Sequence, residues 1–303
     1  MIAQINAKDM RPIDAEYLVA NLPPRRRDGH KGTYGRLLIH AGSQKYRGAA
    51  LLAAEGALRT GVGLVTLASE GAVLDAALVR LPELLLRTCD PISSWGDEEI
   101  ARRVQESAEA SALVVGPGMG VSAALFSFVR ALSLCSGAPL VFDADALGAI
   151  ARYAENVDAF FQSAKRPLLL TPHPLELGRL LGLSAAEVQE SRVAIARACA
   201  RKWGVFLLLK GADTVVTDGE TLLINTSGSS ALSKGGSGDV LAGAVGAFLA
   251  QGAPPLTALA LAAYLHGAAG DLLKSRYSEY GYLTGELAET AARVLGDTLK
   301  DEK

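Results

Sequence analysis

The chain has 303 residues, half of them hydrophobic, and a formal net charge of −2 at neutral pH. This balance excludes a strongly basic surface, so polymeric nucleic acid is not an expected partner. Its three cysteines, Cys89, Cys135 and Cys199, never form a Cys-x-x-Cys pair, which argues against a disulfide framework or a zinc site and favours a reducing compartment. Neither an N-terminal signal core nor an uninterrupted run of about eighteen apolar residues is present, so we expect a cytoplasmic protein.

After a polar N-terminal stretch, short apolar runs alternate with longer helical patterns. The runs are uniformly apolar rather than alternating, as in strands of a parallel sheet that are covered on both faces. We therefore predict a single α/β domain over residues 1–303, with residues 1–31 as a peripheral arm. The predicted strands are residues 36–41, 63–68, 112–115, 140–142, 168–171 and 205–209, and helices are predicted between them, for example at 48–60, 122–134 and 185–202.

The pattern changes toward the C-terminus. Asp218-Gly219 separates two short runs, 213–217 and 221–225, which predicts a hairpin. Two apolar helices are then predicted at 238–251 and 256–275. In open α/β sheets, ligands bind beyond the carboxyl ends of the strands, so we expect the chemistry in the loops that follow the apolar runs.

A glycine-rich segment opens the first of these two helices. Gly235, Gly236 and Gly238 leave backbone N–H groups free at a helix start, where the helix dipole favours an anion such as phosphate. Asp239 follows directly, although its charge would repel a phosphate bound there. We therefore predict that Asp239 accepts the proton of a hydroxyl that attacks phosphorus, the alternative being that it only stabilises the helix N-terminus. The segment is not a P-loop.

Two further segments lie at predicted strand ends. Gly116-Pro-Gly118-Met-Gly120 fits either a glycine turn against a ligand or a purely structural turn, and its spacing does not match the dinucleotide-binding pattern. His173 stands between two prolines, which hold the backbone extended and fix the direction of the imidazole. We expect His173 to be functional.

Three charged residues also follow predicted strands. Lys210, with Gly211 after it, is placed to reach nucleotide phosphates, unless it is an ordinary surface lysine. Asp143 and Asp145 form a carboxylate pair suited to Mg²⁺ held partly through water, although Asp145 is equally explained as a helix N-cap. His266 is expected to pack between helices.

Taken in order, these segments resemble the NAD(P)H-hydrate dehydratases, a branch of the ribokinase-like superfamily. The resemblance implies a three-layer α/β sandwich with a mostly parallel central sheet and helices on both faces. It implies an Mg²⁺-dependent hydro-lyase that moves a phosphoryl group from ADP, or ATP in some members, to the ring hydroxyl of NADH or NADPH hydrate. Phosphate then leaves, and the reduced cofactor is restored. The matching motifs run from His30-Lys-Gly and Gly48-Ala, through Asp143-Ala-Asp-Ala-Leu and Thr171-Pro-His-Pro-Leu-Glu, to Lys210-Gly-Ala-Asp-Thr and Gly235-Gly-Ser-Gly-Asp.

The resemblance also assigns residues. It makes Asp239 the catalytic base and places Ala49, Gly118, His173 and Asp239 against the hydrate. The adenine nucleotide is assigned to Lys210, Gly211, Ala212, Asp213, Thr214, Gly235, Gly236, Ser237 and Gly238. One departure is Ser233, where alanine is common in the family. A homotetramer is implied, and the roughly thirty residues before the match are too few for the epimerase domain of many relatives, so a separate epimerase is expected.

Two other functions fit part of the pattern. A ribokinase-like kinase that phosphorylates an alcohol on a vitamin precursor would use the same glycine–aspartate segment and release a phosphoester. A nucleotide sensor without turnover would also bind phosphate at this helix start. Asp239 argues against the sensor, because a carboxylate near phosphate weakens binding and is explained only by chemistry.

Overall fold

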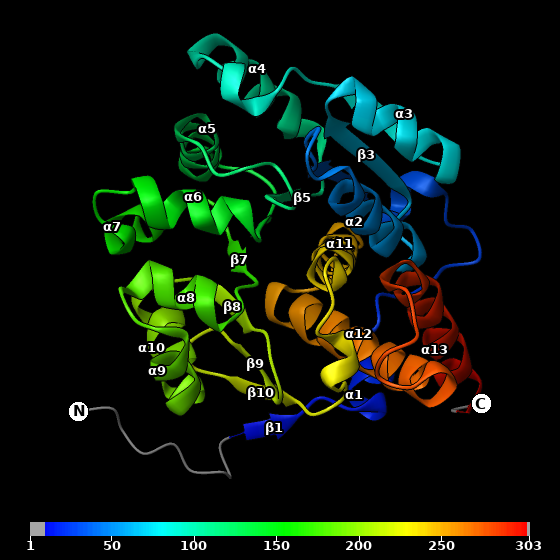
Figure 1. The fold of residues 1–303 in the computed structure, drawn as a ribbon. Helices are drawn as coiled ribbons and strands as arrows, with labels where there is room; N and C mark the ends of the chain where they lie inside the picture. Colours follow the sequence, from blue (N-terminus) through cyan, green and yellow to red (C-terminus); the bar gives the residue numbers. More distant parts are fainter. Residues whose placement is uncertain (1–9, 302–303) are drawn as a thin grey trace.

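The computed structural model describes residues 10–301, which form one mixed sheet covered by helices on both faces (Figure 1). The strands are β1 Met10–Pro12, β2 Arg36–His40, β3 Leu64–Ser69, β4 Leu85–Thr88, β5 Ala112–Val115, β6 Leu140–Phe142, β7 Leu168–Leu170, β8 Phe206–Leu209, β9 Thr214–Thr217 and β10 Leu222–Asn225. Their order in the sheet is β1-β10-β9-β8-β7-β6-β5-β2-β3-β4. Only β9 runs antiparallel to its neighbours β8 and β10.

Thirteen α-helices flank this sheet in the described residues. They are α1 Ala15–Asn21, α2 Arg47–Arg59, α3 Gly71–Arg80, α4 Asp97–Glu106, α5 Ala123–Leu134, α6 Asp145–Tyr153, α7 Val157–Gln162, α8 Pro174–Leu181, α9 Ala185–Glu190, α10 Arg192–Trp203, α11 Ser237–Ala250, α12 Pro255–Tyr277 and α13 Leu287–Asp301.

The sheet separates two hydrophobic cores. Successive residues of a strand point to opposite faces, so in β5 Val114 belongs to one core and Val115 to the other. Helices α1, α2, α3, α11, α12 and α13 cover the first face, and α4 to α10 cover the second. This arrangement confirms the predicted α/β fold with three layers and a mostly parallel sheet.

The predicted strands are present within one residue of their expected bounds, and the hairpin is β9–β10. The predicted helix 185–202 was wrong in one respect, because Ser191 has non-helical backbone angles and separates α9 from α10. Two strands were missed. They are β1 and the edge strand β4, in which Leu85 and Leu86 are substantially exposed, so β4 is not a strand buried on both faces.

Part of the predicted N-terminal arm lies within the described residues. β1 pairs in parallel with β10 at one edge of the sheet. α1 packs against α12, and its Leu18 is fully buried. Residues 1–9 of the arm lie outside the described residues.

Helix α12 is long and apolar enough, by length and composition, to span a membrane. Its mean hydropathy is 1.3 over an 18-residue window, but 61% of that window is buried within the fold. It contacts α11, α13 and strands β8 to β10. Its apolar character is therefore explained by its place in the core.

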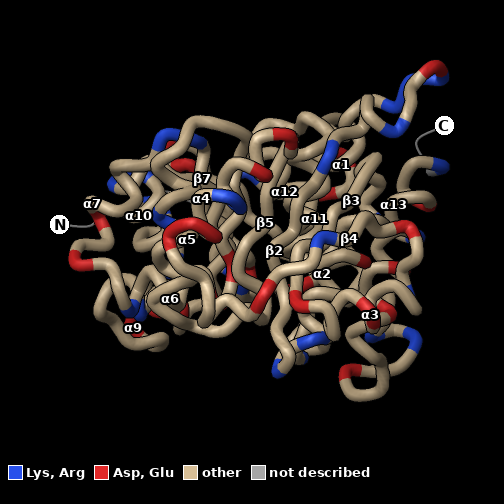
Figure 2. The backbone as a smooth tube through the Cα atoms, turned by 90° about the horizontal axis from the view of Figure 1, so that it is seen from above, with Lys and Arg blue, Asp and Glu red and all other residues tan. Residues whose placement is uncertain are grey.

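Acidic and basic residues are interspersed along the described chain (Figure 2).

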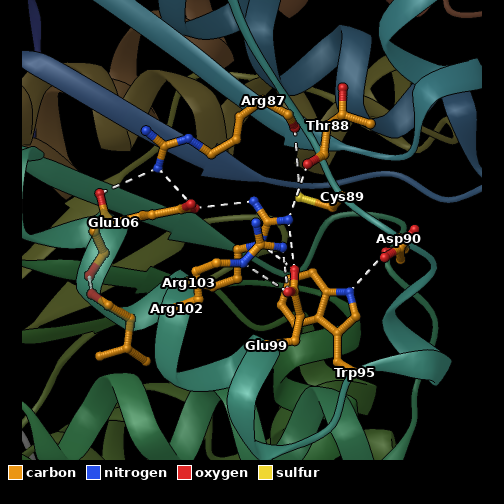
Figure 3. A network of polar contacts seen from close by, with 11 residues as sticks. Arg87, Thr88, Cys89, Asp90, Trp95, Glu99, Arg102, Arg103 and Glu106 are labelled. Carbon is orange, nitrogen blue, oxygen red and sulfur yellow. Dashed lines mark hydrogen bonds and ion pairs between the residues drawn. The ribbon is translucent and has the colours of Figure 1, made fainter.

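A buried polar network attaches α4 to the edge of the sheet (Figure 3). The guanidinium of Arg103 is 2% exposed and donates to Glu99 at 2.7 Å, to Glu106 at 3.1 Å and to the carbonyl of Thr88 at 3.1 Å. Each charge in this network has a partner, which is the condition for burying charges without a large penalty. The network therefore fixes the segment between β4 and α4.

Candidate active site

The site lies at the carboxyl ends of the parallel strands, where the start of α11 meets the loops that follow β6, β7 and β8. A cavity of about 690 Å³ opens here. Its lining includes the predicted nucleotide residues Lys210, Gly211, Ala212, Asp213, Thr214, Ser237 and Gly238, together with His173. The flanking segment from Asn225 to Lys234 supplies much of the remaining wall. Gly235 and Gly236 are in the turn that leads into α11 rather than in the cavity wall.

The glycine-rich turn has the backbone geometry that its sequence suggested. Gly236 is the N-cap of α11 with a φ of +91°, a conformation that side-chain-bearing residues rarely adopt. Two contacts from the C-terminal segment hold this turn. Lys234 donates to the carbonyl of Tyr282 at 2.6 Å, and the hydroxyl of Thr284 donates to the carbonyl of Gly235 at 3.0 Å. These two contacts fix the backbone of the turn that leads into α11.

Lys210 is directed toward this helix start by a buried carboxylate. Its Nζ lies 2.7 Å from Oδ1 of Asp143, which is 1% exposed, and 4.0 Å from Oε2 of Glu176. A Cβ placed on Gly238 would lie 3.2 Å from the same Nζ, so a side chain here would make the ammonium group shift by a few tenths of an ångström. Although burial favours the neutral amine, the two carboxylates raise the pKa of Lys210, and it stays charged.

Asp239 lies in the first turn of α11 and has an unusual acidity. Burial, reinforced by the negative charge of Asp143, raises the pKa of Asp239 to about 7, although Lys210 opposes this rise. A carboxylate with this pKa accepts a proton readily at neutral pH, as a general base requires. Perturbation by burial and a specific like charge, beside a cavity, is typical of functional sites.

His173 and Glu176 cap the start of α8. His173 Nδ1 accepts the N–H of Glu176 at 3.2 Å, and Glu176 Oε2 accepts the N–H of His173 at 2.8 Å. This reciprocal arrangement leaves the His173 ring half-exposed beside the cavity. Burial and the charge of Lys210 lower the pKa of His173, so its imidazole is neutral at pH 7. Glu176 was expected from the sequence only as a favourable charge near this helix N-terminus, and its place three residues after His173 is the spacing of a capping box.

The two other predicted substrate residues lie together. Gly118 has a φ of +64°, and a Cβ placed on it would lie 2.7 Å from the Cβ of Ala49. Neither residue lines the 690 Å³ cavity. The turn is held by Asp145, whose Oδ2 accepts the N–H of Gly120 at 2.8 Å. The Gly116–Gly120 turn therefore packs so closely against the first turn of α2 that a side chain at position 118 would collide with Ala49.

The predicted metal residues have different surroundings. Oδ1 of Asp143 accepts hydrogen bonds from Lys210 and from the hydroxyl of Thr171 at 2.8 Å. Asp145 is the first residue of α6, and the N-cap is Ala144, so the interpretation of Asp145 as an N-cap was wrong. Among residues 10–301, no three His, Cys, Asp or Glu side chains are grouped to hold a metal ion without other ligands.

His266 was expected only to pack between helices, and this was incomplete. It lies on α12 and lines the cavity beside the start of α11. Its Nε2 is 2.9 Å from the carbonyl oxygen of Ser237. Nothing in the sequence indicated this contact, because the two residues are on different helices.

Comparison with known proteins gives consistent matches. The sequence pattern of the NAD(P)H-hydrate dehydratase family matches residues 37–293. The ADP-dependent (S)-NAD(P)H-hydrate dehydratase of Neisseria meningitidis is 38% identical over 88% of this chain and 87% of its own length. The bifunctional NAD(P)H-hydrate repair enzyme Nnr of Moorella thermoacetica is 38% identical over 94% of this chain, which spans 54% of that protein.

A solved structure agrees with these sequence matches. The ADP/ATP-dependent NAD(P)H-hydrate dehydratase from Bacillus subtilis, co-crystallized with ATP and Mg²⁺, superimposes with a TM-score of 0.81 at 31% identity. The match covers 96% of this chain and 100% of that one. By contrast, this chain spans only about half the length of the bifunctional relatives that it matches.

Proposed function

The chain belongs to the NAD(P)H-hydrate dehydratase family, and from this premise we propose that it restores NADH or NADPH from the hydrate at the expense of ADP or ATP. The observation that carries the proposal is Asp239. It is a carboxylate with a pKa of about 7, placed in the first turn of a glycine-rich helix start and beside a charged lysine. This is the arrangement needed to deprotonate a hydroxyl next to a bound phosphate.

In the proposed reaction, Asp239 accepts the proton of the ring hydroxyl as its oxygen bonds to the terminal phosphorus of the nucleotide. The bond from phosphorus to the bridging oxygen breaks, and AMP leaves when ADP is the donor. The ring nitrogen then donates its lone pair as the carbon–oxygen bond breaks and phosphate departs. Loss of a proton from the adjacent ring carbon restores the double bond. Phosphorylation is required because hydroxide is a poor leaving group at neutral pH.

The surrounding residues bind and orient the reactants in this proposal. The N–H groups at the start of α11 and the ammonium of Lys210 stabilise the negative charge of the transferred phosphoryl group. Gly118 and Ala49, whose backbones meet closely, form the support for the hydrate's ring, and His173 contacts it from the edge of α8.

A nucleotide-bound Mg²⁺ fits the carboxylates that are present. Mg²⁺ is commonly held by one or two carboxylates together with phosphates and water, so a complete protein cage is not needed. Oδ2 of Asp143 faces the start of α11, since it would be 4.0 Å from a Cβ on Gly238. We assign Asp143 to this ion, while the carboxylate of Asp145 holds the Gly116–Gly120 turn. When bound, Mg²⁺ offsets the charge of the phosphates.

The test is the identity and ratio of the products. With ADP, Mg²⁺ and NADH hydrate, we expect NADH, AMP and inorganic phosphate in equal amounts, measured by NADH absorbance and phosphorus NMR. A lasting phosphoester signal without recovery of NADH would instead identify a kinase that acts on an ordinary alcohol. Nucleotide binding without any turnover would identify a sensor. If ATP alone supports the reaction and ADP is released, ATP is the donor.

Three expectations stay predictions, the first of them from the sequence composition and the other two from the family resemblance. These are the cytoplasmic location, the homotetramer and the separate epimerase that would interconvert the two forms of the hydrate. The assembly is measured directly by size-exclusion chromatography with light scattering.

A further inference from the structure

The imidazole of His266 makes two contacts to one residue at the start of α11. Its Nε2 lies 2.9 Å from the carbonyl oxygen of Ser237 and 3.0 Å from the Ser237 hydroxyl. A carbonyl oxygen only accepts hydrogen bonds, so Nε2 must carry the proton. His266 is therefore the tautomer protonated at Nε2, and the Ser237 oxygens share this one donor.

The surroundings keep His266 in this form. Burial and the positive charge of Lys210 lower the pKa of His266 to about 4, although its hydrogen bond to Ser237 opposes the shift. The imidazole is thus neutral at physiological pH. Its position is fixed because it belongs to the long core helix α12, which packs against α11.

This tautomer determines what the Ser237 hydroxyl does. Because the hydroxyl oxygen receives the His266 donor, its own proton is directed elsewhere. Within residues 10–301, the Ser237 hydroxyl has no other side-chain or backbone partner. Ser237 lines the cavity as the first residue of α11, next to Gly238, which lines it as well. A donor left unused at this place suits a phosphate oxygen.

We propose that His266 is a positioning residue for the phosphate site, and that it orients the Ser237 hydroxyl to donate to a phosphate oxygen of the nucleotide. The two contacts act together. The hydrogen bond to the carbonyl fixes the backbone of Ser237, and the hydrogen bond to the hydroxyl fixes the rotamer of the Ser237 side chain. His266 itself does not touch the ligand. The inference rests on the proposed function only in taking an adenine nucleotide as the ligand.

The test compares two replacements for His266 by calorimetric titration with ADP and Mg²⁺. The amide nitrogen of glutamine occupies the place of Nε2, whereas that of asparagine ends one bond short. We expect His266→Asn to weaken ADP binding about 10-fold, as for the loss of a hydrogen bond to a charged group, and His266→Gln to stay within about 3-fold of wild type. The KM of the hydrate should be unchanged in both. Equal weakening by the two replacements would overturn the proposal.

A double-mutant cycle separates positioning from a general effect on folding. In a Ser237→Ala background the hydroxyl is absent, so His266→Asn should weaken ADP binding by less than about 2-fold. The same 10-fold weakening in both backgrounds would show that His266 acts without the hydroxyl and would overturn the proposal. Thermal unfolding of each variant is recorded alongside, because a folding defect would also persist in the Ser237→Ala background.

The affinity measurement does not depend on turnover. If the wild-type protein binds ADP but does not act on the hydrate, the proposed function fails while the comparison of His266 variants still stands. If the wild-type protein binds no ADP, this inference fails as well.

Discussion

The ammonium nitrogen of Lys210 lies 2.7 Å from Oδ1 of Asp143, and the same oxygen accepts the hydroxyl of Thr171. These three side chains come from the ends of β8, β6 and β7, which are neighbours in the sheet. Because these strands are parallel neighbours, their carboxyl ends place the Lys210 ammonium and its two partners together at the start of α11. This cation partly offsets the negative charges of Asp143, Glu176 and Asp239. The pKa of Asp239 is therefore about 7 rather than higher, and a substantial fraction of its side chain is ionised at neutral pH.

Replacing Asp239 by Asn should remove most turnover and leave nucleotide binding intact. The amide keeps the shape of the carboxylate but accepts no proton. Loss of a general base costs roughly 10²–10⁴-fold in rate. The measurements are kcat with NADH hydrate and the Kd of ADP by calorimetry. A variant that retained more than about a third of wild-type kcat would exclude Asp239 as the base.

The pH dependence of kcat/KM should show an acid limb near pH 7. Asp239 must be ionised to accept a proton, and its pKa is about 7, so activity should fall as the pH drops below that value. Burial raises this pKa first and the charge of Asp143 second. Asp143→Asn should therefore move the limb to lower pH, whatever it does to the maximal rate. An unchanged limb in this variant would mean that another group titrates.

His173→Asn should raise the KM of the hydrate about 5- to 10-fold, the range for one lost hydrogen bond, and that of the nucleotide much less. Asparagine is a favourable N-cap, so its side chain can still accept the N–H of Glu176 while the Nε2 of the imidazole is lost. The matched control is His173→Ala, which loses the cap as well and should destabilise the protein by about 1 kcal/mol. Equal rises for both substrates, or a rise for the nucleotide alone, would contradict the assignment of His173 to the hydrate.

The central strands could be predicted because each is buried on both faces and its sequence is uniformly apolar. The same reasoning does not apply at the edge of the sheet, because β4 has one neighbouring strand only and its Leu85 and Leu86 are exposed. Pattern reasoning also fails at Ser191, where one helical pattern covers two helices and neither proline nor glycine marks the break between them. The hairpin strand begins one residue later than predicted because Asp213 has a φ of +53°.

The residues of the candidate site could be predicted only where a local sequence pattern pointed to them. The glycines before Asp239 and the prolines around His173 constrain their own backbones, so the sequence alone points to them. The contact of His266 with Ser237 joins positions 29 residues apart on two helices, and the bond from Lys210 to Asp143 joins positions 67 residues apart. The first of these contacts depends on how α11 and α12 pack together, and the second on the order of strands in the sheet, and no local pattern encodes either.

His40 is a buried histidine outside the cavity. It is 1% exposed, and its ring lies edge-on to Phe128 at a centroid distance of 4.9 Å. Within residues 10–301, neither ring nitrogen has a hydrogen-bond partner. Burial, then the charges of Arg103 and Arg87, lower the pKa of His40 to about 3. The unfolded chain therefore binds a proton at His40 that the folded protein excludes, and stability is lost as the pH falls from about 6.5 toward 3.

His40→Phe should accordingly stabilise the protein, and more so in acid. At pH 7.5 the free energy of unfolding should rise by about 1 kcal/mol, because two unpaired polar atoms are replaced by an aromatic edge in an aromatic cluster. At pH 5 the gain should be larger by about 2 kcal/mol, since a group with an unfolded pKa of 6.5 is then mostly protonated only in the unfolded chain. Urea unfolding at both pH values measures these differences. His266 is present in both proteins, so its own contribution cancels, and His30→Asn, at the surface, serves as the control. If wild type and His40→Phe lose the same stability between pH 7.5 and 5, the His40 imidazole is not held neutral by its surroundings.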